Sequence, residues 1–101
     1  MNVTADLMGL KMPFAALKIK IMPSSPKADL KNIELKAKEA IESFDAQLHS
    51  VEIQSIAFGL KSLVLTIAWP EEKDLEMIEN KLNEIKNVNS IEIVDFRRAI
   101  G

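Results

Sequence analysis

The spacing of apolar residues changes along this chain between a pattern typical of strands and one typical of helices. The order of these changes limits the fold more than any other feature. Alternating apolar residues, typical of a half-buried strand, occur in residues 14–22, 48–56, 62–69 and 88–96. Apolar residues spaced three and four apart, typical of an amphipathic helix, run from about Asp29 to Phe44 and again from Leu75 to Ile85. The predicted order is strand, helix, strand, strand, helix, strand.

Residues with special backbone preferences mark the ends of these elements. The loop "PSSPKAD" carries two prolines and two serines, which continue neither a strand nor a helix. Asp29 is predicted to cap the first helix, Pro70 to end the third strand, and Asn87 to end the second helix in a left-handed conformation. The short segment from Ala57 to Lys61 predicts a hairpin turn between the second and third strands.

This element order predicts an α+β fold in which two helices cover one face of a four-stranded antiparallel sheet. The helical stripes, represented by Ile33 and Leu82, are then buried against one set of strand residues. The arrangement is the ferredoxin-like βαββαβ sandwich. A chain of 101 residues is large enough for one domain, predicted over residues 13–101. Residues 1–12 show no clean period and are predicted to form a loosely ordered extension.

Composition excludes several classes of function. The chain has no cysteine, which removes a disulfide framework, a thiolate nucleophile and cysteine-ligated zinc. With 13 Lys and Arg against 15 Asp and Glu, the formal net charge is -2, which gives no overall attraction to nucleic acid. Residues 1–12 lack a basic flank ahead of a long apolar run, so we expect no secretory signal, no membrane contact and a cytoplasmic protein.

No motif in the chain predicts a catalytic or cofactor site. His49 is the single histidine, and we expect it to be an ordinary strand residue, because a triad or metal site needs more partners. Glu71, Glu72 and Asp74 could bind a cation weakly, but we expect them to be favourable carboxylates in the first turn of a helix. The three glycines are too far apart to form a phosphate loop. We therefore expect no metal, no cofactor and no direct nucleotide binding.

Two other classes of protein share the predicted topology. An RNA-binding module needs exposed aromatic residues on its central strands for base stacking, whereas Trp69 is predicted to lie in the core or at its edge. A small-ligand regulatory domain of this topology would pair through its sheet as a dimer. The acidic balance and the lack of interleaved aromatics count against RNA binding, which stays the alternative function.

The hairpin tip has an unusual composition for a turn. Ala57, Phe58, Gly59, Leu60 and Lys61 include one residue, the glycine, that tolerates unusual backbone angles and leaves no apolar surface in water. The apolar side chains could fold inward and close the end of the core. They could equally protrude, with the aromatic ring filling a pocket on a partner and the lysine at its rim.

The segment "IAFGLKSL", preceded by "KIKIMPSSP" at the first strand, resembles the archaeal-type beta subunit of elongation factor one. The same region is similar to the carboxy-terminal catalytic domain of the eukaryotic beta subunit. The resemblance covers about residues 13–98, and the Ala-Phe-Gly-Leu-Lys motif is its most specific part.

The resemblance implies a guanine-nucleotide exchange factor for elongation factor one alpha, the GTPase that carries aminoacyl-tRNA to the ribosome. Residues 57–61 would then bind the partner, with Phe58 inserted into its second domain. No bond in the nucleotide is made or broken, so the resemblance implies a regulatory binding protein and not an enzyme.

The family also implies a second contact at the end of the last strand, near the nucleotide-binding domain of the GTPase. Eukaryotic members carry a near-terminal lysine there, which intrudes on the magnesium and phosphate site. This chain has Arg97 and Arg98 and no lysine. Because an arginine is bulkier and planar, the resemblance does not carry the same insertion over to these residues.

Overall fold

The computed structural model describes residues 14–98. The elements are β1 (Phe14–Pro23), α2 (Leu30–Glu42), β2 (Gln47–Ser55), the short 3₁₀ turn η1 (Ala57–Gly59), β3 (Lys61–Pro70), α3 (Leu75–Asn83) and β4 (Val88–Arg98). The predicted element order is confirmed. The predictions made for residues 1–12 lie outside the described residues.

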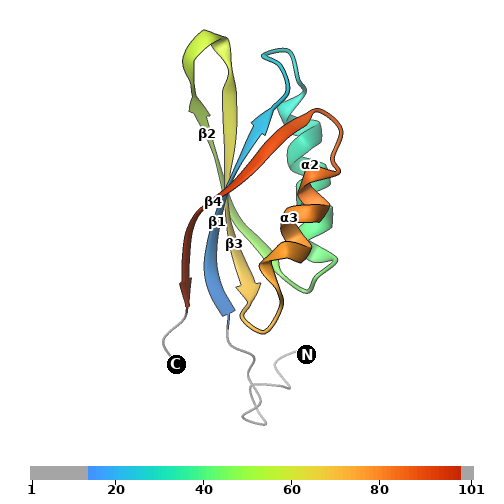
Figure 1. Cartoon of the computed structure of the whole chain (residues 1–101), viewed down its shortest axis with the longest axis vertical. Coiled ribbons are helices and arrows are strands. Elements are labelled where there is room, and N and C mark those ends of the chain that lie inside the picture. Colours follow the sequence, from blue (N-terminus) through green and yellow to red (C-terminus); the bar gives the residue numbers. More distant parts are fainter. Residues whose placement is uncertain (1–13, 99–101) are drawn as a thin grey trace.

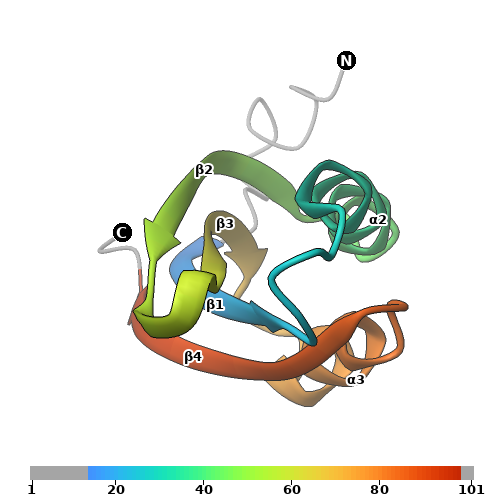
Figure 2. The same ribbon diagram turned by 90° about the horizontal axis from the view of Figure 1, so that it is seen from above.

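The four strands form one sheet in the order β2-β3-β1-β4, and every neighbouring pair is antiparallel. Both helices lie on the same side of this sheet (Figure 1). The view along the long axis shows the twist of the sheet and the two helices side by side (Figure 2). The ferredoxin-like α+β fold is confirmed. No helix among the described residues covers the other face of the sheet, which we call the open face.

The inward-facing side chains of the strands fill the layer between the sheet and the helices. Alternate residues of β1 and β3 point toward the helices, and each is at most 1% exposed: Leu17, Ile19, Ile21, Leu63, Leu65, Ile67 and Trp69. Ile33 of α2 and Leu82 of α3 are both fully buried against them. The helical stripes therefore face the sheet as the sequence predicts, and burial of this apolar surface is the main source of stability.

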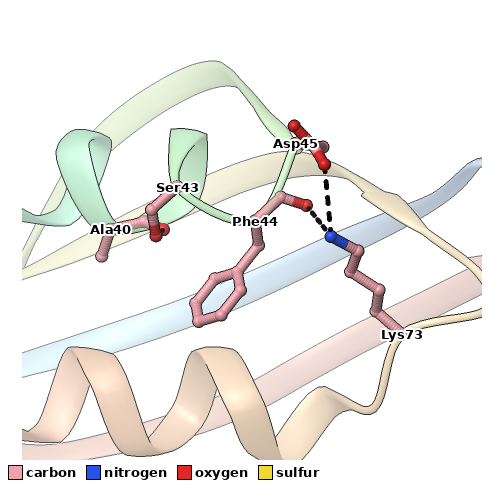
Figure 3. Close-up of polar contacts among 5 residues, drawn as sticks. All are labelled: Ala40, Ser43, Phe44, Asp45 and Lys73. Carbon is pink, nitrogen blue, oxygen red and sulfur yellow. Dashed lines mark hydrogen bonds and ion pairs between the residues drawn. The ribbon is translucent and has the colours of Figure 1, made fainter.

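A polar and aromatic cluster fixes the end of the sandwich where β3 leads into α3. The fully buried Trp69 donates its indole N–H to the carbonyl of Lys73 at 3.0 Å, and the ring of Phe44 packs edge-on against it at 5.7 Å between centroids. The Lys73 ammonium donates to the Phe44 carbonyl at 2.9 Å and to the Asp45 carboxylate at 3.4 Å (Figure 3). These contacts join the segment after α2 to the segment before α3, and the prediction of a core role for Trp69 is confirmed.

The start of α2 agrees with the sequence prediction, whereas the end of α3 differs from it. The Asp29 carboxylate accepts hydrogen bonds from the backbone N–H groups of Lys31 and Asn32, so the predicted cap of α2 is confirmed. The second helix ends at Asn83, before the predicted Ile85. Asn87 has the predicted left-handed conformation, with φ 72°, but it leads directly into β4. Its role as the helix terminator is therefore wrong.

Two other boundaries correct the sequence analysis. Glu71 and Glu72 lie in the turn after β3, and Asp74 is the residue before α3. None of the three belongs to the first turn, because the chain needs these residues to reverse direction after β3. Arg97 and Arg98 are the last residues of β4, paired with Ala16 and Ala15, so the last strand continues two residues past the predicted end at residue 96.

Candidate functional site

The hairpin between β2 and β3 ends in a tight, internally bonded turn. Ile56 donates its backbone N–H to the Leu60 carbonyl at 2.7 Å, and Leu60 donates to the Ala57 carbonyl at 3.3 Å. Between these bonds, Phe58 and Gly59 both adopt the left-handed conformation, with φ 63° and 78°. Figure 1 shows this tip at one extreme of the long axis of the molecule. The predicted turn is confirmed at these residues.

Phe58 projects into solvent from the tip. Its side chain is 95% exposed, more than any other large apolar side chain of the described residues. On the adjoining strand the apolar core ends at Leu63 and burial ends at Ser62, because no helix extends over the tip. The inward-folded arrangement of the tip is therefore wrong. Ala57, Gly59 and Lys61 are also exposed, and Leu60 is half-buried.

The backbone at Phe58 carries a conformational cost with no compensation from packing. A left-handed conformation costs an L-residue with a Cβ roughly 1–2 kcal/mol, and a bulky aromatic rarely adopts it. Glycine or asparagine at this position would avoid that cost. Strained residues of this kind cluster where a protein contacts something else, so the tip is the first candidate contact surface.

The second group of predicted residues lies at the end of β4. Arg97 is paired with Ala16 and Arg98 with Ala15, and successive strand residues point to opposite faces. Because Ala15 is buried toward the helices, Arg97 belongs to the open face and Arg98 to the opposite side. The Arg97 Nε lies 3.1 Å from an Asp95 carboxylate oxygen, and the Arg97 side chain stays 79% exposed.

The structure does not bring the tip and the arginines together. The tip ends with Lys61 at the start of β3, whereas Arg97 lies beside Ala16, which is paired with Ala68 near the other end of β3. At about 3.4 Å per residue, the seven steps from Lys61 to Ala68 span roughly 24 Å. The predicted residues therefore form two candidate contacts at opposite ends of the sheet.

The residues considered for other chemistry do not assemble into a site. Within residues 14–98, no three His, Cys, Asp or Glu side chains lie close enough to hold a metal ion. His49 is exposed on β2, as predicted. The outward positions at the middle of β1 and β3 carry lysine, valine and threonine side chains and no aromatic ring, so this face lacks a base-stacking platform. Neither helix of the described chain is long and apolar enough to cross a membrane.

Comparison with known sequences confirms the family resemblance. Residues 16–99 match the family model described as the EF-1 guanine nucleotide exchange domain. The chain therefore belongs to this family of exchange domains.

Three of the curated relatives that this chain matches are named elongation factor 1-beta. The chain is 39% identical over 83 residues to elongation factor 1-beta of Methanocaldococcus jannaschii, covering 81% of this chain and 93% of the relative. It is 37% identical over 83 residues to elongation factor 1-beta of Methanothermobacter thermautotrophicus, covering 81% and 92%. It is 34% identical over 80 residues to elongation factor 1-beta of Methanococcus maripaludis strain C7, covering 78% and 90%.

Proposed function

We propose that this protein is the exchange factor of elongation factor 1-alpha, which promotes release of GDP and reloading with GTP. The observation that carries the proposal is the strained and almost fully exposed Phe58 in a chain of the EF-1 guanine nucleotide exchange family. An exposed aromatic side chain on a short, hydrogen-bonded turn suits insertion into a partner's pocket, because little conformational freedom is lost on binding.

The mechanism requires only differential binding. A protein that binds the nucleotide-free GTPase more tightly than the GDP-bound form weakens GDP binding by the same factor, because the coupling is reciprocal. No covalent step on the nucleotide is involved, so the protein acts as a regulatory binding partner and not as an enzyme. The proposal places it in the cytoplasm with the translation machinery.

The two ends of the sheet supply different interactions in this proposal. The tip supplies apolar contact area through Phe58 and a cationic rim through Lys61. Arg97 and Arg98 supply positive charge at the other end, directed toward the magnesium end of the nucleotide site. A cation there repels the metal ion or competes for its ligands, which loosens the bound GDP.

The proposal is tested by the release of a fluorescent GDP analogue from purified elongation factor 1-alpha. Stoichiometric amounts of this protein should accelerate release in the presence of excess unlabelled GDP, and the acceleration should rise with protein concentration until the GTPase is saturated. An unchanged release rate at stoichiometric and tenfold excess concentrations would refute the proposed function.

Replacing Arg97 and Arg98 together with alanine should slow exchange while leaving the tip contact, and so much of the binding, in place. The effect should depend on magnesium, because GDP is already held loosely when the free ion is scarce. Stopped-flow release of fluorescent GDP should therefore show a large difference between wild type and double variant at millimolar magnesium and a small one in excess chelator.

Thermal unfolding is the control for this prediction, because the two substitutions also remove the ion pair between Arg97 and Asp95 on the surface of the sheet. An exposed ion pair contributes about 0–1 kcal/mol, so the thermal unfolding of the double variant should stay close to that of the wild type. Equal exchange rates for the two proteins across the whole magnesium range would remove both arginines from the mechanism.

A further inference from the structure

The open face of the sheet carries a shallow groove at the end away from the tip. Its volume is about 350 Å³. All four strands contribute to the lining, which includes Phe14, Ala16, His49, Thr66, Ala68 and Arg97. We call it the alanine groove. It lies on the face that neither helix covers, so within the described chain the groove is open to solvent.

The strand register explains why the surface is hollow here. Ala16 of β1 and Ala68 of β3 lie directly opposite each other on the two central strands, and directly opposed residues share one face of the sheet. The next outward pair along the strands is Lys18 and Thr66, which are larger. The floor therefore consists of two methyl groups between larger side chains.

The floor offers apolar contact but few hydrogen-bonding groups. β1 is an inner strand, paired with β3 on one side and with β4 on the other, so its ladder occupies the backbone N–H and C=O groups. Hydrogen bonds to a ligand must therefore come from side chains at the rim of the groove, where Arg97 and His49 lie. An apolar floor inside a polar rim is typical of protein–protein interfaces.

The charge of the rim determines the kind of partner that fits. Of the two arginines among the residues that line the groove, only Arg97 belongs to the open face, and no carboxylate lines the groove. Asp95 lies beside the groove and engages Nε of Arg97 at 3.1 Å, which leaves the two terminal guanidinium nitrogens outside that ion pair. These nitrogens carry four of the five N–H donors of an arginine side chain, in a geometry that matches a carboxylate.

A phosphate group fits this groove less well than a carboxylate on a peptide. Phosphate sites draw on several backbone N–H groups from a glycine-rich loop or the first turn of a helix. The alanine groove is lined by strands alone, and the amides of its inner strands are engaged in the sheet. A shallow apolar floor with a cationic rim instead suits an extended segment that carries one acidic side chain between apolar ones.

We propose that the alanine groove is a second docking surface for the GTPase, occupied by an acidic and apolar peptide segment whose carboxylate binds Arg97. The proposal rests on the proposed function, since it takes elongation factor 1-alpha as the partner. It adds a contact made by the open face itself, between Phe14 and His49, to the contacts expected from the tip and the strand end.

Filling the groove without changing its charge tests the proposal. Ala16→Leu places a larger side chain on the floor at an exposed position, and it should weaken binding to nucleotide-free elongation factor 1-alpha at least tenfold in isothermal titration calorimetry. The matched control is Ser90→Leu, which introduces the same leucine side chain at an exposed position of the open face opposite Met22. Its affinity should equal that of the wild type.

A cross-linking experiment identifies the occupant directly and does not depend on the folding of the Ala16→Leu variant. Phe14, which is 39% exposed at the edge of the groove, is replaced by the photoreactive benzoylphenylalanine in the full chain. Irradiation of the complex should attach it to a GTPase peptide that contains an aspartate or glutamate flanked by apolar residues. Attachment to a segment without a carboxylate, to the nucleotide, or to nothing would overturn the proposal.

The outcomes separate this proposal from the proposed function. If the wild type fails to accelerate GDP release, the function itself is wrong. If the wild type accelerates release, the Phe58→Ala variant binds weakly and Ala16→Leu binds as tightly as Ser90→Leu, only the groove proposal fails.

Discussion

Replacing Phe58 with alanine will weaken binding to elongation factor 1-alpha by about 2 kcal/mol, roughly thirtyfold, without destabilising the fold. The ring is 95% exposed and contributes nothing to the core, so its removal costs contact area on the partner alone. Binding is measured by calorimetry with the nucleotide-free GTPase, exchange by fluorescent GDP release, and stability by thermal unfolding. The loss should appear in the first two measurements and not in the third.

A matched substitution separates the ring from its backbone conformation. Asparagine tolerates the left-handed conformation that Phe58 adopts at φ 63°, so Phe58→Asn should unfold at the same temperature as the wild type or slightly higher, and should bind as poorly as Phe58→Ala. Phe58→Tyr should retain most of the binding. A large fall in melting temperature for Phe58→Ala, with exchange intact per folded molecule, would mean that the tip serves the fold instead of the partner.

Leu82→Asp should unfold the domain. Leu82 is fully buried where α3 faces the sheet, and a carboxylate there is either ionised without a partner or protonated with unmet hydrogen bonds. The cost, with the lost apolar burial included, is on the order of 4–5 kcal/mol or more, against a typical total stability of about 5–15 kcal/mol. Circular dichroism should show no cooperative thermal transition.

The control for this prediction is Asn80→Asp, which adds the same charge at an exposed position of α3. Its melting curve should stay close to that of the wild type. A soluble Leu82→Asp variant with a cooperative transition would show that α3 presents a different face to the sheet.

The fold could be predicted because its signals are local and repeated. Alternation through Leu17, Ile19 and Ile21 indicates a strand whichever neighbour it pairs with, and the stripe through Ile33 indicates a helix in the same way. The end of α3 at Asn83 could not be predicted, because Ile85 continues the helical spacing while packing against the core from the following turn.

The candidate site could be predicted in position but not in conformation. The motif around Phe58 indicates a turn, yet the direction of the side chain depends on the φ value of Phe58, and the sequence favours neither direction. Arg97 and Arg98 belong to β4 because Ala16 and Ala15 of β1 pair with them, which is a contact between distant parts of the chain. No local pattern in "RRAIG" indicates a strand.

The alanine groove is the clearest case of a feature that only the register reveals. Ala16, Ala68 and Arg97 are ordinary residues in the sequence and distant from one another, and no motif connects them. They become neighbours because β1 is paired on both sides. A search for small outward-facing residues on the two central strands would have found its floor, once the strand order was known.

The single sheet that joins the tip to the arginine end holds them at a fixed distance from each other. β3 runs without interruption from Lys61, the last residue of the tip, to Pro70, and its ten residues fix the spacing. In the proposed complex, the sheet holds the arginine end at a set distance from Phe58, so we expect the second contact to form as an intramolecular step at high effective concentration. The length of β3 therefore sets how far apart two surfaces of the partner must lie to contact the tip and the arginine end together in that complex.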